Sequence, residues 1–187
     1  MSQLLAIVAV LWMAQSTITI KTANNTPREL RARQLLEEAL AAHDLRRYTF
    51  TREVVIQEGA INHSFPVLTL NAGFATADDV LSTYIHEQIH WYLRERNDDQ
   101  RQAIAALRRM YPNVPAAAEG GAESEISTYG HLVTCFLEIA VDRRLIGKER
   151  TAAVLSRKRN YQWIYKTVVD NEAKIASVVR RYDLEIR

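Results

Sequence analysis

Residues 76–97 read TADDVLSTYIHEQIHWYLRERN and carry a strong helix signal. Thr76 is a favoured N-cap residue, and Asp78 and Asp79 place acidic side chains in the first turn, where the helix dipole stabilises them. Apolar residues then recur at the spacing of an amphipathic helix. We therefore expect one helix from Thr76 to about Asn97, with the rest of the fold packed around it.

This predicted helix carries the motif His-Glu-x-x-His at residues 86–90. His86 and His90 are four residues apart, so both imidazoles lie on one helix face and can reach the same ion. Glu87 lies about 100° round the helix from His86. There its carboxylate can activate a zinc-bound water and pass the proton to a leaving amine. Apolar neighbours on both sides favour a partly buried pair over two surface histidines. The motif thus predicts a zinc site with Glu87 as the catalytic base.

This helix resembles the active-site helix of the zincin metallopeptidases. Residues 91–96, which follow His90, read WYLRER and lack the Gly and third His of the metzincins. The resemblance is closer to the gluzincins, in which a later helix supplies the third ligand. It implies a Zn²⁺-dependent peptidase in which an edge strand ahead of the helix binds the peptide substrate by strand addition. Residues 65–70 occupy that position in this chain.

The third metal ligand is expected from a later apolar helix, Ala122 to Ile146. His131 and Glu138 are seven residues apart on it, which places them on one face about 10 Å apart along the axis. The gluzincin resemblance favours Glu138, whereas the open flank beside Gly130 favours His131. We expect His131 to be the ligand, with Glu138 orienting a ligand or taking its place. The alternative is a polar stripe that faces solvent.

Other residues of reactive type have simpler interpretations. His43 and His63 are expected at the surface, and Cys135 is expected to be a small core residue. Tyr84 or Tyr129 could polarise a scissile carbonyl, although a packing role is commoner for either. The predicted site therefore consists of His86, Glu87, His90 and a third ligand, His131 or Glu138.

The flanking segments predict a mostly helical α+β fold with a small sheet. Residues rich in β-branched and aromatic side chains suggest strands at Tyr48–Gln57 and Phe65–Leu70. The second should be an edge strand, because Pro66 cannot donate a ladder hydrogen bond. Helices are expected at Glu29–Leu45, Asp98–Met110, Ala122–Ile146 and, as one or two helices, Lys148–Asp183. Residues 21–187 are interpreted as a single zincin-like metallohydrolase domain.

The first twenty residues differ from the rest of the chain. Leu4 to Ala14 form an unbroken apolar run, long enough for a signal peptide but short for a membrane span. No Lys or Arg precedes the run, which argues against export. The segment is therefore a signal peptide, a membrane anchor or a buried helix. We expect a membrane-associated or exported protein, with association through residues 4–20, and a cytoplasmic protein if the segment is structural.

Composition excludes several classes of protein. Across 187 residues, 48% are hydrophobic and 25% are charged, which is typical of a globular domain. A net charge of +2 argues against a nucleic-acid partner. The single Cys135 excludes an intrachain disulfide. The predicted partner is a peptide or a small amide, and the oligomeric state stays open. The alternative function is a helical binding or membrane-associated protein with a structural or degenerate metal site.

Overall fold

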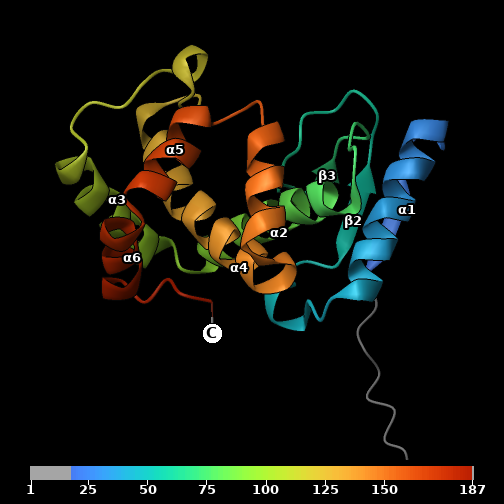
Figure 1. Ribbon diagram of the computed structural model, residues 1–187, viewed down its shortest axis with the longest axis horizontal. Coiled ribbons are helices and arrows are strands. Elements are labelled where there is room, and N and C mark those ends of the chain that lie inside the picture. The colour runs from blue at the N-terminus through green and yellow to red at the C-terminus, as the bar shows by residue number, and fades with distance from the viewer. Residues whose placement is uncertain (1–17, 187) are drawn as a thin grey trace, which may run out of the picture.

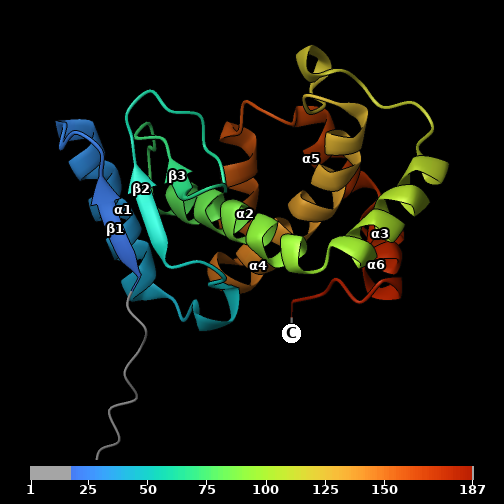
Figure 2. The same cartoon turned by 180° about the vertical axis from the view of Figure 1, so that it is seen from behind.

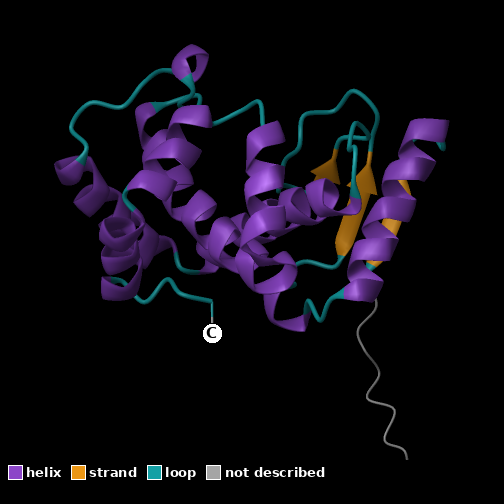
Figure 3. Cartoon of the chain, in the orientation of Figure 1, coloured by secondary structure: helices purple, strands orange, loops and turns teal. Residues whose placement is uncertain are grey.

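A small sheet and a larger set of helices lie side by side in the computed structural model, which describes residues 18–186 (Figure 1). Helix α2 (Ala77–Glu95) runs from the sheet into the helical part, and the other helices of that part follow it in sequence. The predicted mostly helical α+β fold is confirmed (Figure 3).

The sheet has three parallel strands in the order β1 (Thr19–Thr22), β2 (Glu53–Ile56) and β3 (Leu68–Leu70). Parallel neighbours need a crossover connection. Helix α1 (Pro27–Ala42) supplies it between β1 and β2, and lies against one face of the sheet (Figure 2). Alternate side chains of β2 are buried on that face, whereas Glu53 is exposed. The sheet is therefore covered on one side by helices.

The strands are shorter than predicted, and one was not predicted. In the range Tyr48–Gln57 only Glu53–Ile56 is paired, and Arg46–Tyr48 forms a 3-10 turn instead. In the range Phe65–Leu70 only Leu68–Leu70 is paired, so Pro66 lies ahead of the ladder. β3 is nonetheless an edge strand, as predicted. The β-branched composition extends further than the pairing because four-residue β1 and three-residue β3 set the length of the ladder.

The N-terminal apolar segment overlaps this sheet at its end, since Thr19 and Ile20 belong to β1. Residues 1–17, on which the choice between signal peptide, anchor and buried helix depends, lie outside the described residues. Within residues 18–186, no helix combines the length and apolar character needed to cross a membrane.

Capping residues mark the start of α2 and of α1. Thr76 accepts a hydrogen bond from Asp79 N–H while Asp79 accepts one from Thr76 N–H, which forms a capping box. Thr26 and Glu29 form the same arrangement at the start of α1. The remaining helices are α3 (Asn97–Met110), α4 (Glu125–Arg157), α5 (Gln162–Asp170) and α6 (Glu172–Arg181).

Helix α4 bends sharply at Gly147, which has φ 81° and ψ 165° and separates two helical halves (Figure 1). Only glycine adopts this conformation readily. The first half packs against α2, and the second half returns along the molecule to the start of α2. There Arg150 pairs with Asp78, and Arg157 pairs with Asp79 at 2.7 Å. The bend thus brings the chain after Arg157 beside the His-Glu-x-x-His motif.

Candidate metal centre

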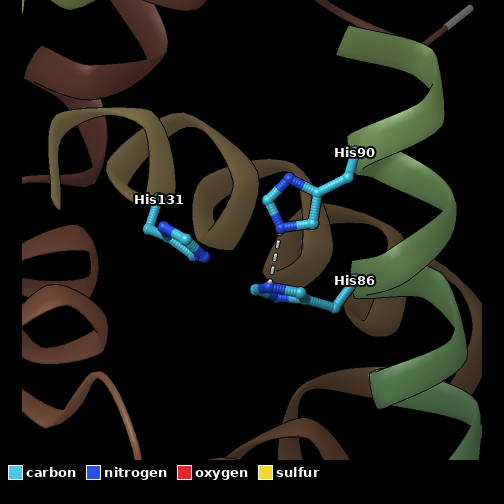
Figure 4. Close-up of side chains that lie close together, drawn as sticks. All are labelled: His86, His90 and His131. Carbon is cyan, nitrogen blue, oxygen red and sulfur yellow. Dashed lines mark hydrogen bonds between the residues drawn. The ribbon is translucent and has the colours of Figure 1, made fainter. Parts of the chain in front are cut away.

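Three imidazoles converge between α2 and α4. His86 and His90 project from α2, and His131 points toward them from α4 (Figure 4). One nitrogen from each ring lies within 4.8 Å of those of the other two. The Nε2 atoms of His86 and His90 are 3.2 Å apart. Two ligands of a tetrahedral zinc ion with Zn–N bonds of about 2.0–2.1 Å lie about 3.3–3.4 Å apart. The pair therefore has the spacing of ligands to one zinc ion.

Hydrogen bonds at Nδ1 fix the orientation of two of these rings. The Nδ1–H of His86 donates to Glu138 Oε2 at 2.8 Å, and the Nδ1–H of His131 donates to the carbonyl of Ser127 at 2.8 Å. Each acceptor lacks a proton of its own, so the ring nitrogen is the donor. In the neutral form of each ring, Nε2 then carries the lone pair, which is the arrangement that metal-binding histidines require.

Glu138 lies behind His86 and is completely buried. Its Oε2 accepts hydrogen bonds from His86 and from the hydroxyl of Tyr165 at 2.7 Å. Its Oε1 accepts from Ser82 Oγ at 2.8 Å and pairs with Lys158 Nζ at 2.7 Å. Four donors therefore occupy this carboxylate. Of the two roles that the sequence left open for Glu138, the geometry favours orienting His86 over binding the ion.

A second grouping of His86, Cys135 and Glu138 could also hold a metal ion. It is a poorer site for two reasons. Glu138 would have to give up donors that already satisfy it, and burial raises the pKa of the Cys135 thiol, which disfavours the thiolate that binds metals. The cluster of His86, His90 and His131 is therefore the candidate metal centre.

The charge on Glu138 governs the electrostatics of the cluster. Burial opposes protonation of His86, but the Glu138 carboxylate outweighs it and raises the pKa of His86 to about 10. Burial, assisted by the charge on His86, lowers the pKa of His131 to about 4 and that of His90 well below its usual value. His90 and His131 are thus neutral at pH 7, whereas His86 is protonated and would release its Nε2 proton on binding a metal ion.

Glu87 is almost buried and is held by the loop ahead of β3. Ser64 Oγ donates to Glu87 Oε2 at 2.6 Å, while Trp91 Nε1–H donates to the Ser64 carbonyl at 2.9 Å. Glu87 and His86 both line a pocket of about 450 Å³ that opens to solvent. The carboxylate is therefore fixed beside the histidine cluster and faces a space in which a substrate can lie.

Tyr161 lines the same pocket and was not singled out from the sequence. Its ring centroid lies 4.3 Å from that of His131 and 6.0 Å from that of His86. It has φ 59°, a left-handed conformation that is uncommon for a bulky residue and is concentrated at functional sites. Burial raises the pKa of Tyr161 to about 12, so its hydroxyl is a hydrogen-bond donor at neutral pH.

The tyrosines considered from the sequence lie elsewhere. Tyr84 and Tyr129 are both fully buried, and the Tyr129 hydroxyl donates to the carbonyl of Tyr111 at 2.6 Å. Neither lines the pocket beside Glu87. Tyr161 is the N-cap residue of α5, and its position in the sequence gives no direction for the side chain.

The edge strand does not present an open edge at its centre. Thr69 N–H donates to the His63 carbonyl at 2.8 Å, and His63 N–H donates to the Thr69 carbonyl at 3.0 Å. A peptide added there would have to displace His63. The His63 side chain is exposed and lies outside the metal cluster, as does that of His43, the C-cap residue of α1.

Comparisons with known proteins leave the family undetermined, because no family model, no curated protein and no solved structure matches this chain.

Proposed function

We propose that this chain is a zinc-dependent hydrolase that cleaves an amide bond, with His86, His90 and His131 as metal ligands and Glu87 as the general base. One observation carries the proposal: three imidazoles from two helices converge on a single point beside a carboxylate that lines an open pocket. Three protein ligands with a fourth position left open are typical of catalytic zinc, whereas structural zinc sites are closed by four protein ligands.

A zinc ion bound there would act as a Lewis acid, which lowers the pKa of water to about 7 and polarises a carbonyl group. Glu87 takes a proton from the attacking water and delivers it to the leaving nitrogen, so that the amine departs neutral. Tyr161 donates a hydrogen bond to the oxygen on which negative charge develops. Glu138 keeps His86 in the tautomer that exposes Nε2.

The pocket supports a peptide or small amide substrate better than the sheet edge does. Strand addition needs unpaired backbone groups, and those of Thr69 are bonded to His63. The pocket instead offers apolar surface from Ile61, Phe74 and Val154 next to His86 and Glu87. We therefore place the substrate in the pocket.

The metal content of the purified protein is the first test. We expect about one zinc per chain by mass spectrometry, as three-ligand catalytic sites hold one ion. The ion should be lost in His86→Ala and in His131→Ala, and retained with weaker affinity in Glu138→Ala. Folded protein without metal at micromolar zinc would contradict the proposal.

Activity is the second test, measured as cleavage of a library of dipeptides and N-acyl amino acids by the zinc-loaded protein. Glu87→Gln should bind zinc normally and lose activity by at least about 100-fold, because general base catalysis contributes about 10²–10⁴. Glu95→Gln is the matched control, since Glu95 is exposed on the same helix. Full activity in Glu87→Gln would show that Glu87 is not the base.

A further inference from the structure

Three consecutive basic residues line one side of the pocket: Arg157, Lys158 and Arg159. Arg157 is the last residue of α4, and the other two follow it, where the bend at Gly147 brings the chain back beside α2. A run of basic residues is usually a solvated surface feature. Here, however, the run lines the same pocket as His86 and Glu87.

Two of the three cations already have partners within the protein. Arg157 makes two hydrogen bonds to Asp79 Oδ1, at 2.7 and 2.9 Å. Lys158 is largely buried and pairs with Glu138. Burial opposes its charge, but Glu138 raises the pKa of Lys158, so the pair stays ionised. Neither residue is available to a ligand without breaking a contact that shapes the site.

Arg159 differs from its neighbours. Its side chain is exposed, and within residues 18–186 it forms no ion pair or hydrogen bond. The two acidic side chains of the pocket wall already have partners, since Asp79 pairs with Arg157 and Glu87 accepts a hydrogen bond from Ser64. An arginine binds a carboxylate with two parallel hydrogen bonds. Arg159 is therefore an unpaired group that can bind a carboxylate, and it lines the same pocket as His86 of the candidate metal centre.

We propose that the substrate is a short amide with a free carboxylate, which Arg159 binds while the amide lies at the metal centre. The inference rests on the proposed function and narrows its substrate class. A pocket of about 450 Å³ has the size of sites for small ligands, and the occupied edge of β3 argues against an extended peptide. A peptide bound through its C-terminal carboxylate and an N-acyl amino acid share this chemistry.

The test measures binding, not turnover, with hydroxamates that chelate zinc. The probes are the monohydroxamates of succinic, glutaric and adipic acid, each compared by calorimetry with its uncharged carboxamide analogue. At the best chain length, zinc-loaded wild-type protein should bind the carboxylate about 10-fold more tightly or better, since a charge-assisted hydrogen bond contributes at least that much.

Variants assign the preference to one residue. Arg159→Gln should bind both analogues equally and keep its affinity for the carboxamide, and Arg159→Lys should keep part of the preference. Arg109→Gln is the matched control. Arg109 is exposed on α3 and does not line the pocket, so its substitution removes the same charge from another part of the surface. It should behave as wild type.

Two failures are distinguishable. Equal binding of carboxylate and carboxamide by the wild type, or a preference that survives in Arg159→Gln, overturns the inference and leaves the zinc hydrolase intact. Zinc-loaded protein that binds no hydroxamate of either kind has no open metal position, which overturns the proposed function and the inference with it. Cleavage of the N-acyl amino acids but not of dipeptides, or the reverse, would separate the two sources of the carboxylate.

Discussion

Tyr161 has an unusual backbone conformation and lies beside the candidate metal centre. A tyrosine at φ 59° costs about 1–2 kcal/mol relative to an ordinary helical conformation. The surrounding structure holds it there, against His131 on one side and the pocket on the other. The Tyr161 ring thus lies beside the histidine cluster and lines the pocket, and the proposed mechanism assigns its hydroxyl the role of oxyanion donor.

Tyr161→Phe should therefore reduce kcat by about 100-fold and change KM little, because one oxyanion donor contributes about 10²–10³ in rate. Zinc content should stay at the wild-type level. Tyr165→Phe is a useful comparison, since Tyr165 also lines the pocket but donates its hydroxyl to Glu138. It should weaken zinc binding and leave kcat of the loaded enzyme nearly unchanged. The same kinetic loss in both variants would contradict a transition-state role for Tyr161.

Asp142 has a buried carboxyl group that the proposed reaction does not use. Its side chain is fully buried one turn after Glu138, and neither carboxylate oxygen has a hydrogen-bond partner among the described residues. Burial, assisted by repulsion from Glu138, raises the pKa of Asp142 to about 7, while the nearby Ser82 hydroxyl, which donates to Glu138, and the charges of Lys158 and His86 oppose that shift. The folded protein therefore holds this carboxyl protonated at mildly acidic pH.

The raised pKa predicts a loss of stability with rising pH. Below pH 3.8 the carboxyl is protonated in both states, and between 3.8 and about 7 only the folded state keeps the proton. Its contribution to the unfolding free energy thus falls by up to about 1.4 kcal/mol per pH unit through this window and is constant above it. Asp142→Asn should be more stable than wild type at pH 8, and the difference should shrink toward pH 4.

Urea unfolding in EDTA at pH 4 to 8 would measure this difference. Asp99→Asn is the control, because Asp99 is only half-buried in the first turn of α3 and its substitution changes the net charge equally. A constant difference between wild type and Asp142→Asn across the series would show that Asp142 titrates normally.

At the scale of elements, helices were easier to predict than strands because their signals are local. Thr76 caps the helix that its sequence predicted, and the first half of α4 ends at Gly147, next to the predicted helix end at Ile146. β1 was not predicted, because a four-residue strand exists only through its pairing with β2. Sequence composition cannot show such pairing, and it cannot show that Thr69 bonds to His63.

The candidate site also has a part that local sequence predicts and a part that depends on how the helices pack. The spacing of His86, Glu87 and His90 follows from one helix, so it could be predicted from the sequence. The choice of His131 over Glu138 depends on how α4 packs on α2, and Tyr161 depends on a bend and a turn. The geometry brings His131 to the cluster and Glu138 behind it, but metal binding itself stays a prediction.

Two glycines of α4 give a paired prediction for the bend. Gly147→Ala should lower the unfolding free energy by about 1–3 kcal/mol, because φ 81° with ψ 165° is accessible essentially to glycine alone. Gly130→Ala makes the same substitution within the helix, where the new Cβ would lie 3.8 Å from Ile104 Cδ1 in ordinary contact. It should stabilise the protein by about 0.5–1 kcal/mol. Denaturant unfolding of both variants measures the change in unfolding free energy, which should be negative for Gly147→Ala and positive for Gly130→Ala. Stabilisation by Gly147→Ala would contradict the glycine-only conformation at the bend.

On the scale of the whole molecule, the metal centre joins parts that are distant in sequence. α2 packs on the sheet and on both halves of α4, and the three histidines of the candidate centre come from α2 and α4 (Figure 1). An ion at this junction would bind only the folded state, in which the two helices meet, because the unfolded chain has no such site. Zinc binding should therefore stabilise the whole fold, not only the pocket.

This linkage predicts a rise in Tm with zinc that depends on the ligands. Zinc at 100 times its Kd should add about 2.7 kcal/mol to the unfolding free energy of wild type. His131→Ala should lose most of this increment, because the ion is then held by α2 alone and no longer connects the two helices. His43→Ala should keep it, since His43 caps α1 away from the cluster. An increment of equal size in all three proteins would mean that zinc binds elsewhere, and calorimetric scans with zinc and with EDTA decide between these outcomes.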